Sequence, residues 1–168
     1  MFQIIFVVET NNNTKSDDRY IDRLIKLRYD FSNNEYKLQY VHMNGKGNFK
    51  KRNIKNEIIS FQKLNRNGIN YVIYCFDTDR IETNPEEYKT LQERKKYCDI
   101  NGYMFIWFDP NIERVLIKKD VEIKYKKQEA LNFYKKNLII DEKILLHNNY
   151  KSGCSNIYLV LDKILKRK

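Results

Sequence analysis

Short apolar runs divide the first part of the chain. Three of these runs are apolar almost throughout, and a fourth alternates apolar and polar residues: 3–8 (QIIFVV), 69–76 (INYVIYCF), 103–108 (YMFIWF) and, alternating, 36–40 (YKLQY). An unbroken apolar run of this length is typical of a strand covered on both faces, and alternation is typical of a strand with one wetter face. We therefore predict four β-strands.

Helix signals separate these strands. We expect Ser16 to cap the first helix, and Asn84, with Pro85 after it and Glu87 three positions on, to begin the third. The second, over 54–64, repeats apolar side chains every three or four residues. Three successive strand–helix units predict an α/β fold, a Rossmann-like three-layer sandwich with a mostly parallel central sheet of about four strands.

The remainder of the chain has a looser pattern. Short helices are expected over 111–117, 127–136 and 155–165. No linker, repeat or change of composition marks a second domain. We predict one domain over 1–168, with a core over about 3–117 and a C-terminal helical extension over about 118–168.

Composition adds an expectation about partners. Lys and Arg number 32 against 22 Asp and Glu, a net charge of +10, and such an excess favours polyanions such as RNA or DNA. A solvated, Lys-rich surface is the alternative. Three separated cysteines without a C-x-x-C pair indicate a reducing compartment and no structural zinc. No apolar run is long enough to span a membrane, and no basic leader is evident, so we expect a cytoplasmic protein without a membrane partner.

Three acidic residues follow two of the predicted strands. Glu9 ends the first strand, and Asp77 and Asp79 follow the third. The carboxyl ends of parallel strands meet at one edge of a sheet, so these carboxylates converge if strands one and three are neighbours. Residues i and i+2 of an extended chain point to the same side, so both Asp side chains can face one cation. Carboxylates without His or Cys suit Mg²⁺ or Mn²⁺; solvated loop acids or helix caps are the alternative.

The order of these acids resembles a known family. A strand ending in Glu, then a helix, another strand and helix, and a strand ending in Asp-x-Asp look like the Toprim domain of topoisomerases, primases and related nucleases. The likeness is nearer to the small RloB-type Toprim proteins of bacterial anti-phage (abortive-infection) systems. It is carried by FVVETNNNTKSDDRY around Glu9, by NGKGN over 44–48 and by DPNIE over 109–113.

This resemblance implies roles for the acids. Asp77 and Asp79 would hold Mg²⁺, or Mn²⁺, at the scissile phosphate, and Glu9 would be a metal ligand or a general acid/base. Glu113 is a candidate fourth acid, with a surface helix position as the alternative. Phosphate-binding candidates are a set of basic side chains after the second and third strands: Arg80, Lys46, Lys50, Lys51 and Arg52.

Other chemistry-bearing residues are interpreted as structural. His42 and His147 belong to no H-x-x-H pattern, and Trp107 and most tyrosines are expected in the core. Tyr29 or Tyr125 would stack on bases if exposed.

The first functional hypothesis is a Mg²⁺-dependent Toprim nuclease that cleaves RNA such as tRNA, or DNA, as an anti-phage effector. A separate ATPase chain would control it, and a homodimer is compatible with the sequence. The alternative is a non-catalytic nucleic-acid- or protein-binding module, because Thr10 and Lys15 stand where the family commonly has Gly and a second acid. A phospho-receiver domain is a third reading, although Glu9-Thr10 lacks its usual pair of adjacent acids.

Overall fold

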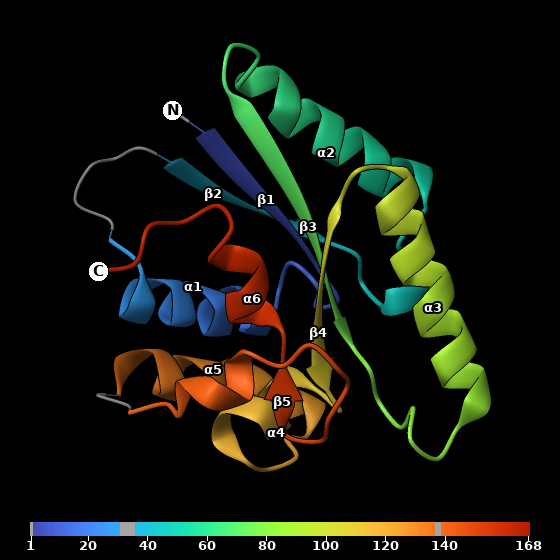
Figure 1. Ribbon diagram of the computed structural model, residues 1–168, viewed down its shortest axis with the longest axis vertical. Helices are drawn as coiled ribbons and strands as arrows, with labels where there is room; N and C mark the ends of the chain where they lie inside the picture. Colours follow the sequence, from blue (N-terminus) through green and yellow to red (C-terminus); the bar gives the residue numbers. More distant parts are fainter. Residues whose placement is uncertain (1, 31–35, 137–138) are drawn as a thin grey trace.

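A five-stranded sheet forms the middle layer of the computed structural model, which describes residues 2–30, 36–136 and 139–168 (Figure 1). The strands are β1 (Phe2–Val8), β2 (Tyr36–His42), β3 (Ile69–Asp77), β4 (Met104–Asp109) and β5 (Cys154–Ser155), in the order β2-β1-β3-β4-β5. β1 to β4 are parallel, and β5 is antiparallel to β4. The predicted α/β sandwich is confirmed; the short fifth strand was not predicted.

Helices cover both faces of this sheet. They are α1 (Ser16–Arg28), α2 (Arg52–Leu64), α3 (Pro85–Ile100), α4 (Ile112–Ile117), α5 (Lys126–Lys135) and α6 (Ile157–Leu161), with 3-10 turns η1 (Lys46–Asn48), η2 (Ile123–Tyr125) and η3 (Glu142–Leu145). Figure 1 shows α2 and α3 together on one side, and α1 with the C-terminal helices on the other. Among the described residues, no helix combines the length and apolar character needed to cross a bilayer.

The central strand β1 explains the two-sided core. Its residues 4–8 are fully buried. Because successive side chains of a strand point to opposite faces, Ile4 and Phe6 pack towards α1, whereas Ile5 and Val7 pack towards α2 and α3. An unbroken apolar run at this position is therefore required by the fold.

The sheet order decides whether the predicted acids can meet. β1 pairs with β3 in parallel, with Phe6 opposite Ile73 and Val7 opposite Tyr74. The condition that strands one and three are neighbours is therefore fulfilled, and both strands end at the same edge of the sheet.

The starts of three helices agree with the sequence to different degrees. Asn84 caps α3 as predicted, with its Oδ1 accepting the N–H of Glu86 at 3.1 Å. The expected capping role of Ser16 is wrong: the helix already includes Ser16, and Lys15 occupies the preceding position in a left-handed conformation, with φ of 47°. The helix expected over 155–165 is shorter, Ile157–Leu161, because residues 154–155 pair with β4 instead.

Buried ion pairs attach the C-terminal segment to the end of α1. The Arg28 side chain, 4% exposed, binds Asp162 through Nη2 at 2.9 Å and Nε at 3.0 Å, and it also contacts Glu142. Tyr29 donates its hydroxyl to Asp162 at 2.8 Å, and Arg167 pairs with the same carboxylate. Here the positive and negative charges are in balance.

Candidate metal and nucleic-acid site

Glu9 and Asp77 are in direct contact at the carboxyl edge of the sheet. The backbone N–H of Asp77 donates to Glu9 Oε1 at 2.9 Å, although 68 positions separate the two residues. Both side chains line a hollow of about 230 Å³, together with Asp17 from α1 and Lys126 from α5. The structure thus brings together two of the three predicted acids and adds a third that was not predicted.

Asp17 is the acid that sequence reasoning missed. It lies in the first turn of α1, is only 8% exposed, and its carboxylate accepts the Thr10 N–H at 3.3 Å. A signal for its burial exists in the sequence. Asp17 precedes Ile21 by four positions and Leu24 by seven, so it lies on the buried side of the helix.

Glu113 is a buried member of the same neighbourhood. It lies in α4, is 1% exposed, and its Oε1 lies 3.0 Å from Lys126 Nζ. The alternative of a surface helix position is therefore wrong. Its negative charge also raises the pKa of Asp17 and of Asp77. Lys126 brings a positive charge to this edge from the C-terminal extension.

The acids of this hollow hold their protons more tightly than ordinary carboxyl groups. Burial, followed by repulsion from Asp17 and Asp79, raises the pKa of Glu9 to about 8. Burial and the charge of Glu113 raise the pKa of Asp17 to about 6. The pKa of Asp77 also rises well above its usual range, through burial and the charge of Glu9. Negative charge at this edge therefore exceeds what Lys126 offsets.

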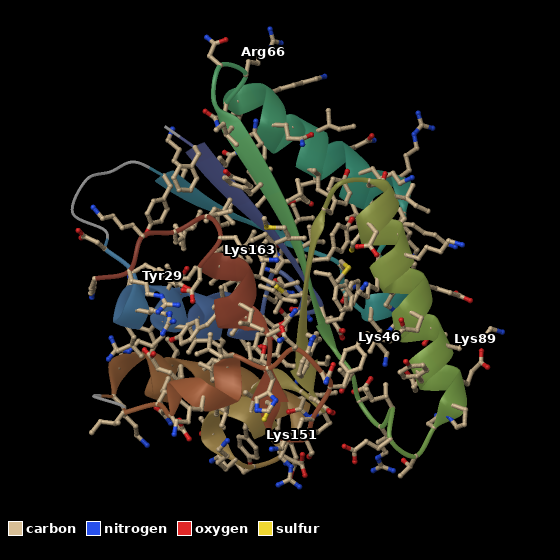
Figure 2. The ribbon with its side chains drawn as sticks, in the orientation of Figure 1. Tyr29, Lys46, Arg66, Lys89, Lys151 and Lys163 are labelled. Atoms are coloured by element: carbon tan, nitrogen blue, oxygen red, sulfur yellow. The ribbon has the colours of Figure 1, made fainter. Side chains whose placement is uncertain are left out.

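Asp79 points to a different partner. The chain is not extended beyond Asp77, because Asp79 has a left-handed φ of 56° and donates its N–H to the Pro110 carbonyl at 2.8 Å. The expectation that Asp77 and Asp79 lie on the same side of an extended chain is therefore wrong. The Asp79 carboxylate forms an ion pair with Lys46, which also binds Glu87 at 2.7 Å. Figure 2 shows Lys46 between the end of β3 and α3.

The predicted phosphate-binding residues lie at the same edge as the acids. Arg80 is exposed and lines a hollow of about 530 Å³ with Asp79 and Arg114. Lys50, Lys51 and Arg52 are exposed at the beginning of α2, and Lys46 is held in its ion pairs. Four of the five basic candidates are therefore free to meet solvent or a polyanion, as far as the described residues show.

The histidine, tyrosine and tryptophan candidates differ in how far they are exposed to solvent. His42 Nε2 lies 2.9 Å from Asp18, which agrees with a structural role. Tyr29 is fully buried, so the idea that it stacks on bases is wrong, whereas Tyr125 is 53% exposed. Trp107 is in the core, as expected. His147 is half-buried and its backbone N–H donates to the Ser155 carbonyl.

The donor chemistry of the acid hollow fits a hard divalent cation. Within residues 2–30, 36–136 and 139–168, no three His, Cys, Asp or Glu side chains approach closely enough to enclose a metal by themselves. Mg²⁺, however, is usually bound through one or two carboxylates, with waters and substrate phosphates completing its shell. Asp17, Asp77 and Glu9 line the same hollow and could supply such carboxylate ligands.

Comparisons with known proteins add no family. No protein-family model matches the chain, and no curated protein matches its sequence. The fold and the site together define an α/β three-layer sandwich with an acidic hollow at the carboxyl edge of its parallel strands.

Proposed function

We propose that the protein is a Toprim-type nuclease that uses Mg²⁺ or Mn²⁺ to cleave phosphodiester bonds of RNA, such as tRNA, or of DNA. One observation carries this proposal: the buried Asp17 and the half-buried Glu9 and Asp77 share a hollow in which Lys126 is the basic side chain among the described residues. Grouping acids away from water is costly unless a cation offsets their repulsion. A divalent ion with its phosphate ligand meets that need.

Each side chain has a task in this proposal. A bound Mg²⁺ would polarise the scissile phosphate and offset charge on its oxygens. Asp77 is held for that purpose by the backbone N–H of Ile112, which donates to Asp77 Oδ1 at 3.1 Å. Glu9 accepts the Asp77 N–H through one oxygen only. Where Asp77 and Asp17 would hold the ion, Glu9, whose pKa burial raises to about 8, would serve as the general acid/base.

The surroundings of the hollow support a polyanionic substrate. Arg80 follows β3, and Lys50, Lys51 and Arg52 follow β2, so all four leave the same edge of the sheet as the acids. Their exposure and the net charge of +10 favour phosphate binding with release of counterions. The role as a cytoplasmic anti-phage effector under an ATPase partner belongs to the same proposal and is supported by the Toprim likeness.

Cleavage assays with single-site variants test the proposal. The purified chain is incubated with tRNA, single-stranded RNA and DNA, with Mg²⁺, Mn²⁺ or EDTA. Asp77→Asn and Glu9→Gln should each lower the metal-dependent cleavage rate by about 100-fold or more. Glu93→Gln, which changes an exposed acid of α3, should leave the rate unchanged. Full-rate cleavage by Asp77→Asn would contradict the proposal.

A second candidate function is a non-catalytic binding module. It is favoured by the internal cations: Lys126 already pairs with Glu113, and Lys46 with Asp79. In that case calorimetry finds no Mg²⁺ binding to the wild-type chain, while RNA still binds with a steep dependence on salt. Saturable Mg²⁺ binding that Asp77→Asn removes favours the nuclease.

A further inference from the structure

A hollow lies along α3 and the outer edge of β4. Its volume is about 630 Å³, and on α3 it is lined by side chains three or four positions apart: Tyr88, Gln92, Lys95 and Asp99. Residues 103–107 form the opposite side, together with the segment that precedes α6. Among the described residues it shares no lining side chain with the hollow around Glu9. We refer to this hollow as the α3–β4 groove.

Aromatic rings form one wall of the α3–β4 groove. Tyr150 packs on Trp107 with ring centroids 5.1 Å apart, and on Tyr88 at 6.3 Å with the planes at 90°. Trp107 is 2% exposed and anchors this wall, whereas Tyr88 is 48% exposed. A large aromatic side chain that stays open to solvent beside a groove offers a face on which a planar ring can stack.

Polar groups of the groove suit the edge and the phosphate of a nucleotide. Gln92, Asn148 and Asn149 present side-chain amides, which can both donate and accept hydrogen bonds. Lys95 and Lys163 are exposed at the groove, and Lys95 already neutralises Asp99, at 3.4 Å. Lys163, labelled in Figure 2 beyond α6, leaves a positive charge in excess.

The outer edge of β4 is closed to an added peptide strand. The Asn156 side chain accepts the Trp107 N–H at 2.9 Å and donates to the Phe105 carbonyl at 3.0 Å. These are the backbone groups that a pairing strand would use. A polypeptide that extends the sheet would have to displace Asn156, so the groove favours a ligand that stacks and accepts hydrogen bonds from side chains.

We propose that the α3–β4 groove binds a nucleobase together with its phosphate. The base stacks on the exposed Tyr88 with Tyr150 at its edge, the amides of Gln92, Asn148 and Asn149 contact the polar edge of the base, and Lys163 pairs with the phosphate. The source of this ligand is a free nucleotide or one residue of a single-stranded nucleic acid. The inference does not rest on the nuclease activity, because the acid hollow contributes no residue to it.

Binding measurements in EDTA test this inference separately from cleavage. Calorimetry follows adenosine and uridine monophosphates, and anisotropy follows a labelled single strand of about eight nucleotides. Tyr88→Ala should weaken binding about fivefold or more. Ile100→Ala, which removes a large exposed side chain elsewhere on α3, should leave it unchanged. Lys163→Gln should weaken binding of the monophosphates but not of the nucleosides, whereas Lys151→Gln, an exposed lysine outside the groove, should affect neither.

The two probes distinguish the source of the ligand. Monophosphates that bind as tightly as the strand assign the groove to a free nucleotide, and binding of the strand alone assigns it to single-stranded nucleic acid. Equal effects of Tyr88→Ala and Ile100→Ala, or no binding of either probe, would overturn the proposal. So would binding of an unstructured peptide in the groove without any nucleotide binding.

Discussion

Two clusters of charged side chains lie at opposite ends of α1 and shift the pKa of a carboxyl group in opposite directions. At the C-terminal end, Arg28 and Arg167 meet Asp162 and Glu142. Although burial opposes it, hydrogen bonds from Arg28, Arg167 and Tyr29 lower the pKa of Asp162 to about 2. At the N-terminal end, Asp17 shares its hollow with further acids and one lysine among the described residues, and the pKa shifts run upward.

The cluster around Arg28 stabilises the fold, whereas the acid hollow is suited to binding a cation. In the balanced cluster each carboxylate has a guanidinium or hydroxyl partner, so ionisation favours the folded state. In the acid hollow, ionisation opposes the folded state until a cation arrives. Four buried or half-buried acids, Glu9, Asp17, Asp77 and Glu113, surround a single ammonium group in the described part of the chain.

Breaking the balanced cluster should have the largest effect. Arg28→Met leaves Asp162 and Glu142 without their buried partner and removes the guanidinium that lies 4.3 Å from the Tyr158 ring. We expect the free energy of unfolding to fall by about 2–3 kcal/mol in urea titrations, because charged hydrogen bonds of a buried guanidinium are lost while Asp162 keeps Arg167 and Tyr29. Lys119→Met, which removes the more exposed pair with Glu129, serves as control and should cost about 1 kcal/mol or less. Equal losses for both variants would refute a structural role for the balanced cluster.

Removing one acid from the hollow should raise, and not lower, the free energy of unfolding. Glu9 has a folded pKa of about 8 against an ordinary value of 4.5, so the folded state binds more protons than the unfolded state between these values. The stability contributed by protonated Glu9 is fully present below pH 4.5 and is lost as the pH rises towards 8. Glu9→Gln should therefore raise stability at pH 8.5 by about 1 kcal/mol or more, and change little at acid pH.

Denaturant unfolding at several pH values, in EDTA, measures this effect. The slope of stability against pH should flatten in Glu9→Gln and stay unchanged in Glu93→Gln, an exposed control on α3. If Glu9→Gln lowers stability equally at every pH, the hollow does not hold mutually repelling acids and the comparison with the balanced cluster fails.

The smallest change in the free energy of unfolding is expected at the partly exposed ion pairs of Lys46. Lys46 is 20% exposed and binds Asp79 and Glu87, whose side chains are 46% and 31% exposed. Water screens such a pair, so Lys46→Met should lower the free energy of unfolding by about 1 kcal/mol or less. A loss comparable to that of Arg28→Met would show that the Lys46 pairs belong with the balanced cluster.

The strands and part of the candidate site could be predicted from the sequence. The other site residues depended on strand order, backbone conformation and long-range packing. Unbroken apolar runs located β1, β3 and β4, and the ends of β1 and β3 located Glu9 and Asp77. Their contact depended on strand order, which a single sequence does not encode. The position of Asp79 depended on its left-handed backbone, a conformation that glycine would have signalled more strongly than aspartate.

Long-range packing supplied the other parts of the site. Lys126 reaches the acids because α5 packs against α1, a contact between segments about a hundred residues apart that no local pattern records. β5 is two residues long, too short for alternation to reveal it. The burial of Asp17 could have been predicted, since its spacing from Ile21 and Leu24 places it on the buried side of α1.

The most direct test of the account is the effect of Mg²⁺ on thermal stability at pH 8, where the acids of the hollow are more ionised than at neutral pH. A ligand at a hundred times its dissociation constant stabilises the folded state by about 2.7 kcal/mol. The account predicts a saturable rise in Tm for the wild-type chain and for Glu93→Gln, and its loss in Asp77→Asn. Identical Tm values with and without Mg²⁺ in the wild-type chain would contradict the claim that this hollow is a divalent-cation site.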